Sequence, residues 1–124
     1  MKKHPAVEAL RKAARGLLLP SETDAPLKPF LWEGAGGKLS KDRVRELAGA
    51  GEDASVEETS LDDLFETVPD EDRPNFEKLS AAIRQQLSGV KVYKLGDEAE
   101  RDVYVVGKTQ DGQWAGLKTR VVET

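Results

Sequence analysis

The sequence predicts an α+β fold in which helices pack around one antiparallel sheet of about four strands. Two observations favour this class. Apolar residues recur at helical spacing in the first two thirds of the chain, whereas the last third reads as consecutive strands with a strong hairpin signal between two of them. The length of 124 residues fits one domain, so we expect a single domain over residues 1–124.

A first helix is expected over residues 5–15. Pro5 suits its first turn, where the missing N–H would be unpaired anyway, and Gly16 suits the left-handed position just after the last turn. The apolar residues at 3.6-residue spacing are Val7, Leu10, Ala14 and Leu17.

The next segment contains a loop, a short strand and a glycine-rich turn. Residues 21–26 are interpreted as an exposed loop, because their polar side chains favour turns and Pro26 cannot donate to a sheet ladder. A strand is expected over residues 30–32. The glycine-rich residues 33–37 lack the strand, lysine and helix of a phosphate loop, so we interpret them as a turn.

Two short helices and a strand are expected in the middle of the chain. Ser40 can cap the first helix, which Gly49 or Gly51 would close. A strand follows over residues 56–59, and Ser60 can cap the second helix. The apolar residues of these two helices are Val44, Leu47, Ala48, Leu64 and Phe65.

A longer helix over residues 74–87, terminated by Gly89, is expected before the strands of the last third. The run 103–106, Val-Tyr-Val-Val, is typical of a central strand buried on both faces. Asp111-Gly112 predicts a hairpin. The expected strands cover residues 90–95, 101–109 and 114–123.

The composition removes several kinds of catalytic site. The chain has no cysteine, which excludes disulfides, thiolate nucleophiles and sulfur-based zinc sites. Its single histidine, His4, is interpreted as an exposed residue before the first helix. No apolar run approaches the length that spans a bilayer, and no signal-peptide core follows the first residues. We therefore expect a cytoplasmic protein.

Charge is distributed unevenly along the chain, whose net charge is -4. Residues 1–20 carry five bases and one acid, residues 21–76 carry fifteen acids and six bases, and residues 77–124 carry seven acids and eight bases. Ten acids and no base lie in the stretch 52–72. Such a surface repels phosphate and attracts a basic protein, but the same run is also typical of a solvated charged face.

Two long segments resemble the nuclease A inhibitor family. They are residues 17–34, LLLPSETDAPLKPFLWEG, and residues 92–124, VYKLGDEAERDVYVVGKTQDGQWAGLKTRVVET. Weaker matches cover residues 59–65 and 76–79. The resemblance implies an α-β-α sandwich around an antiparallel sheet, in agreement with the elements expected from the residues.

The resemblance also implies a function and a site. The activity it implies is one-to-one inhibition of a ββα-metal, sugar-non-specific DNA/RNA nuclease, in which a loop glutamate reaches the nuclease's catalytic magnesium. The matching glutamate is Glu22, and the matching end of the chain is Thr124. No cofactor is expected, and the only metal contact is that of Glu22 with the partner's magnesium. We expect a monomer when the protein is free, because the acidic face must stay open.

The candidate partner-binding residues are Ser21, Glu22, Thr23, Asp24, Trp114 and Thr124. Asp24 belongs to the acids that would imitate DNA and steer association, together with Glu33 and the 52–72 run. Trp114 suits either a contact or packing on the sheet, whereas Trp32 favours packing.

The segment 69–74 departs from the family pattern, since it is shorter than the family's aromatic-containing insertion and lacks a tryptophan. This difference leaves open a different nuclease, or a protein-binding module with a non-nuclease partner. An enzyme that uses carboxylates is not expected, because the spacing shows no paired acid and base and no nucleophile–histidine partnership.

Overall fold

The structure, a computed structural model, describes residues 4–20, 24–32, 38–50, 54–96 and 100–122. The helices in these ranges are α1 (Pro5–Ala14), α2 (Lys41–Leu47), α3 (Leu61–Leu64) and α4 (Arg73–Gln86). The strands are β1 (Leu18–Leu19), β2 (Ala25–Pro26), β3 (Lys28–Trp32), β4 (Val56–Thr59), β5 (Ser88–Leu95), β6 (Glu100–Lys108) and β7 (Trp114–Val122).

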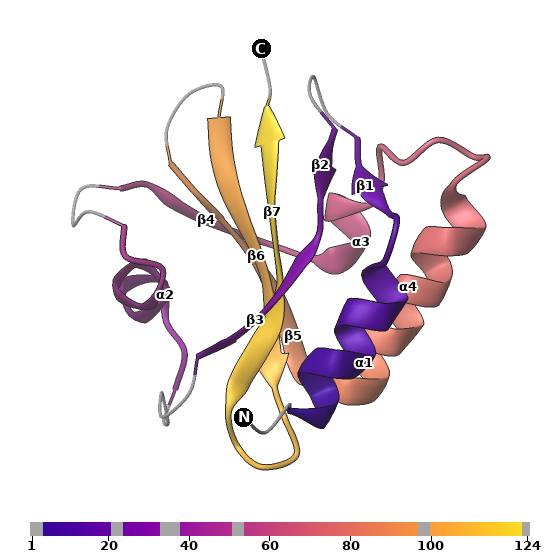
Figure 1. Cartoon of the computed structure of the whole chain (residues 1–124). Helices are drawn as coiled ribbons and strands as arrows, with labels where there is room; N and C mark the ends of the chain where they lie inside the picture. Colours follow the sequence, from indigo (N-terminus) through magenta and orange to yellow (C-terminus); the bar gives the residue numbers. More distant parts are fainter. Residues whose placement is uncertain (1–3, 21–23, 33–37, 51–53, 97–99, 123–124) are drawn as a thin grey trace.

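The helices lie on both faces of a central sheet, with α1, α3 and α4 on one face and α2 on the other (Figure 1). The sheet has five antiparallel strands in the order β3-β7-β6-β5-β4. The predicted α+β class is therefore confirmed. The expected number of about four strands is too low, because β3 and β4 both join the three strands of the last third as its edges.

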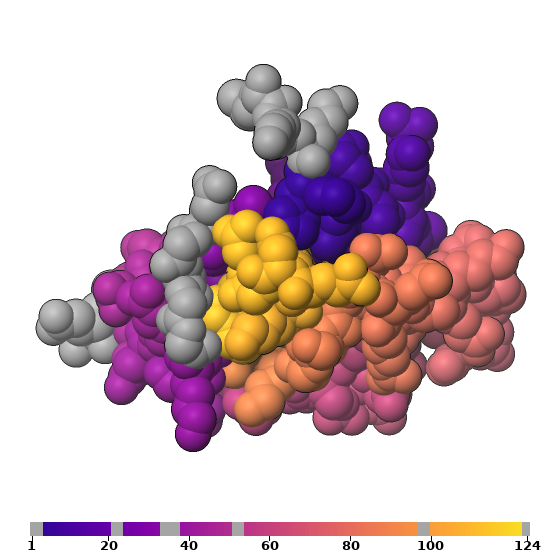
Figure 2. Space-filling model, turned by 90° about the horizontal axis from the view of Figure 1, so that it is seen from below, coloured from indigo at the N-terminus to yellow at the C-terminus, as the bar shows by residue number. Residues whose placement is uncertain are grey.

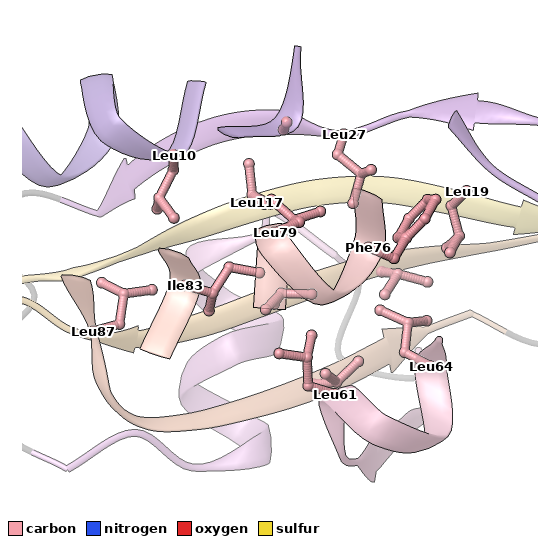
Figure 3. Close-up of a cluster of buried hydrophobic side chains, with 14 of the residues drawn as sticks. Leu10, Leu19, Leu27, Leu61, Leu64, Phe76, Leu79, Ile83, Leu87 and Leu117 are labelled. Atoms are coloured by element: carbon pink, nitrogen blue, oxygen red, sulfur yellow. The ribbon is translucent and has the colours of Figure 1, made fainter. Parts of the chain in front are cut away.

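The central position of β6 is confirmed by burial on its two faces. Val103 and Val105 are fully buried in the cluster under α1 and α4, whereas Tyr104 and Val106 lie in the cluster under α2. The larger cluster also holds Leu10 of α1 and the apolar face of α4 (Figure 3). A strand that is buried on both faces needs apolar side chains at every position, which explains the continuous run of β-branched and aromatic residues in β6.

The predicted caps of the short helices are confirmed. The Ser40 hydroxyl accepts a hydrogen bond from the Arg43 N–H at 3.2 Å, and the Ser60 hydroxyl accepts one from the Asp63 N–H at 3.1 Å. Gly49, which follows α2, has φ 72°. These bonds satisfy helix N–H groups that have no partner within the helix.

The start of α1 differs from the prediction, because the side chain of His4 is largely covered. Its Nδ1 accepts a hydrogen bond from the Ala6 N–H at 3.2 Å, and its Nε2 lies 3.0 Å from the Asp111 carboxylate. Figure 2, a view from the end opposite Val122, shows the β6–β7 hairpin beside the start of α1. His4 thus joins α1 to that hairpin, a long-range contact that the sequence pattern does not reveal.

Two further expectations were wrong. Ala25 and Pro26, expected in a loop, form β2, which pairs antiparallel with β1. A two-residue strand outside the main sheet makes few ladder bonds, so a proline is tolerated there. Gly89 does not end α4, because β5 begins at Ser88; with φ 61°, Gly89 lies at the register shift of β5. The turn expected at 33–37 lies outside the described residues.

In the described ranges, no helix combines the length and apolar character required to cross a membrane.

Candidate partner-binding site

Four of the candidate residues, Ser21, Glu22, Thr23 and Thr124, lie outside the described residues. The structure does describe the strands to which they are attached. Leu18 pairs with Pro26 and Leu19 with Ala25, so residues 20–24 join two paired strands. Thr124 follows β7, which ends at Val122.

The β1–β2 hairpin and the last residues of β7 lie at the same end of the sheet (Figure 1). Both strands of the hairpin contact β7. A groove of about 430 Å³ has Asp24 and Pro26 on one side and Thr119 and Arg120 on the other. The structure therefore brings Asp24 together with the second half of β7. Both lie next to the residues from which Ser21–Thr23 and Thr124 continue.

This groove carries charges of both signs. The carboxylate of Asp102 lies 3.4 Å from the guanidinium of Arg120. Lys28 and Lys118 are exposed and directly paired across β3 and β7, and the Lys118 ammonium lies 5.4 Å from the ring centre of Tyr104. Like charges that face each other across strands are unfavourable. The surface beside the candidate site is therefore mixed rather than uniformly acidic.

Leu18 is a candidate that the sequence analysis missed. It is 51% exposed and is the one exposed large hydrophobic residue in the described part of the chain, whereas its neighbour Leu19 is 1% exposed. Successive side chains of a strand point to opposite sides. Because β1 starts just after α1, its leucines continue the apolar pattern of the helix, and the sequence does not show which of them alternates to the outside. Leu19 fixes the hairpin to the core, and Leu18 offers apolar surface beside the candidate site.

Trp114 lies far from the other described candidate. Trp114 begins β7, whereas Asp24 borders Thr119 and Arg120, five and six residues further along the same strand, which at about 3.3 Å per residue is about 16–20 Å away. Trp114 is half-buried, pairs across the sheet with Trp32 and packs on the cluster under α2. The structure does not bring Trp114 together with Asp24.

Trp32 packs in the sheet, as its sequence context indicated. Its ring centre lies 4.7 Å from that of Phe30 and 5.4 Å from that of Tyr104. Both tryptophans thus border the core under α2.

The acids of the stretch 52–72 are partly neutralised by bases from elsewhere in the chain. The ion pairs are Glu57–Arg101 at 2.6 Å, Glu58–Lys91 at 3.7 Å, Asp62–Arg84 at 3.2 Å and Asp70–Arg73 at 2.9 Å. Burial, together with the neighbouring Glu58 carboxylate, raises the pKa of Tyr93. The surface of this stretch is therefore less acidic than its ten acids suggest. Two of the bases reach β4 from β5 and β6, one lies on α4 opposite α3, and Arg73 pairs locally with Asp70.

The described residues offer no metal centre of their own. Among them, no group of three or more histidine, aspartate or glutamate side chains is arranged to hold an ion. The described surface around the candidate site carries mixed charge, an exposed leucine and a two-stranded hairpin.

Comparison with known proteins identifies the family to which this fold belongs. The family model described as nuclease A inhibitor-like protein matches residues 4–124, nearly the whole chain. A search of curated proteins finds no match. The chain therefore belongs to the nuclease A inhibitor-like family, and this membership implies inhibition of a nuclease as its general function.

Proposed function

We propose that this protein inhibits a metal-dependent, sugar-non-specific ββα-metal nuclease by binding it one-to-one. Glu22 would place its carboxylate at the catalytic magnesium of the nuclease, and Thr124 would add a contact beside it. The free inhibitor is a monomer in this proposal, since the hairpin end must be open to the partner.

The chemistry of magnesium supports a carboxylate as the inhibiting group. Mg²⁺ prefers oxygen ligands and keeps several waters, which a substrate phosphate displaces in nuclease sites. A carboxylate from an inhibitor can take the same position and so exclude the substrate. One carboxylate alone does not make a magnesium site, so the metal would have to come with the nuclease.

The observation that carries this proposal is the position of the β1–β2 hairpin. The hairpin contacts β7, so the attachment points of Ser21–Thr23 and of Thr124 lie at one end of the molecule. One partner surface could therefore reach both segments at the same time. Leu18, exposed on β1, would add apolar contact area to this interface.

The pairing of β1 with β2 also supports a positioning role for the hairpin. Leu19 is buried in the same cluster as Phe76 and Leu79 of α4. A segment held at both ends by a packed hairpin loses less conformational freedom on binding than a free loop, which favours tight association.

The test is a titration of a ββα-metal nuclease with the wild-type protein, Glu22→Ala and Glu46→Ala in the presence of Mg²⁺. Glu46, on α2, is a matched control because it changes the net charge equally on the other face of the sheet. We expect complete inhibition at one equivalent of wild type or control. Glu22→Ala should weaken binding by about 2–5 kcal/mol, as for truncation of a buried interface charge. Equal inhibition by all three proteins would contradict the role of Glu22.

A further inference from the structure

A second groove lies between α3 and α4, and its floor is aromatic. Its volume is about 290 Å³. The rings of Phe65 and Phe76 meet edge to face there, with their centres 5.0 Å apart. Phe76 is buried, whereas Phe65 is only half-buried. We call this feature, bordered by Asp62, Phe65, Glu66, Arg73, Phe76 and Glu77, the α3–α4 groove.

The rim of the α3–α4 groove carries unpaired negative charge. The one base on it, Arg73, is bound to Asp70 at 2.9 Å, and Asp62 is bound to Arg84 at 3.2 Å. Glu66 and Glu77 are both exposed, and no base in the described ranges lies within ion-pair distance of their carboxylates. As far as the described residues show, the groove therefore combines an aromatic floor with two carboxylates that have no ion-pair partner.

This combination is complementary to a lysine or arginine side chain. A cation is attracted to the face of an aromatic ring, and its aliphatic part can pack on the same ring. The carboxylates at the rim can accept hydrogen bonds from the charged end. An anionic side chain would be repelled by the carboxylates, and a neutral one would lack both the cation–π attraction and the charge-assisted hydrogen bonds, so the groove favours a basic occupant.

We propose that the α3–α4 groove binds a lysine or arginine side chain of the nuclease that this protein inhibits. This inference rests on the proposed function, because a nuclease must present basic side chains to the phosphates of its substrate. The groove adjoins the hairpin: Leu19 of β1 lies beside Phe76 and Leu64 (Figure 3). The groove would thus extend the interface from the hairpin across α3 and the first turns of α4 (Figure 1).

The first test needs no nuclease. The full chain is titrated with a tetra-arginine peptide while backbone amide shifts are recorded by NMR, for the wild type and the double variant E66Q/E77Q. The control D42N/E46Q removes the same charge from α2 on the other face of the sheet. We expect shifts concentrated in residues 62–80 for wild type and control, and their loss in E66Q/E77Q. Shifts that are absent, or equal at α2 and at the groove, would overturn the inference.

The second test measures inhibition of the nuclease by the same three proteins. E66Q/E77Q should weaken inhibition about tenfold, with a smaller dependence on salt, whereas the control should change it less than about twofold. Phe65→Leu, which keeps most of the apolar volume, should also weaken inhibition and retain the wild-type fold. If E66Q/E77Q inhibits as well as the wild type while Glu22→Ala is still defective, the role of the groove is contradicted and the proposed function is not. If wild type inhibits no nuclease, the proposed function fails and the peptide titration decides the groove.

Discussion

Leu18 and Leu19 are neighbours in β1, yet the structure predicts opposite consequences for their replacement by alanine. Leu19 is 1% exposed and lies in the main core, whereas Leu18 is 51% exposed. The same three carbon atoms are removed in each variant, so any difference in the free energy of unfolding reports the environment of the side chain.

The magnitudes follow from this difference in burial. Removing three buried carbons costs about 2.4 kcal/mol at about 0.8 kcal/mol each, and the cavity left behind adds to this. Leu19→Ala should therefore lower the free energy of unfolding by about 3 kcal/mol. Leu18→Ala should lower it by less than about 1 kcal/mol, because half of the side chain is already in water and no closed cavity forms.

Urea denaturation followed by tryptophan fluorescence measures both values. Native proteins have free energies of unfolding of about 5–15 kcal/mol, so both variants should stay folded. Inhibition provides an independent reading: Leu18→Ala should weaken inhibition while its stability stays near that of the wild type. Equal losses of stability in the two variants would refute the assignment of Leu19 to the core and of Leu18 to the surface.

Three further predictions concern the fold. Asp111 accepts hydrogen bonds from Thr109, Gln113 and His4, which hold its pKa well below the ordinary value. The free energy of unfolding that Asp111→Asn removes should therefore be present at pH 6 and shrink as the pH falls below about 4. A difference between the two proteins that grows in acid, measured by urea denaturation, would contradict this. Gly116→Ala would place a Cβ 1.7 Å from a carbonyl oxygen of β6 and should cost more than about 2 kcal/mol, so an unchanged melting temperature would exclude this close approach. Ser60→Ala should cost about 1 kcal/mol in urea denaturation through loss of the α3 cap, and no loss would exclude that role.

Local features of the fold were predictable because they depend on nearby residues. The cap residues Ser40 and Ser60, the hairpin at Gly112 and the twice-buried strand β6 follow from side-chain hydrogen bonds, backbone freedom and burial pattern. The family resemblance, carried by residues 17–34 and 92–124, was confirmed over nearly the whole chain.

Features that depend on residues far apart in sequence were not predictable in the same way. Pairing of β1 with β2 overrode the turn preference of Pro26, and the contact of His4 with Asp111 required α1 to lie beside the β6–β7 hairpin. The bases that neutralise the acids of 52–72 come from β5, β6 and α4, so a count along the chain overstated the acidic field. Leu18 was missed for a related reason, since only the packing of β1 decides which leucine is buried.

The most direct test of the central claim is the magnesium dependence of the complex. The dissociation constant of the inhibitor and a ββα-metal nuclease is measured with Mg²⁺ and without metal, for the wild type and Glu22→Gln. If the Glu22 carboxylate binds the metal of the nuclease, Mg²⁺ should tighten the wild-type complex, and Glu22→Gln should lose most of that gain while binding without metal changes little. An equal gain from Mg²⁺ in both proteins would contradict the claim.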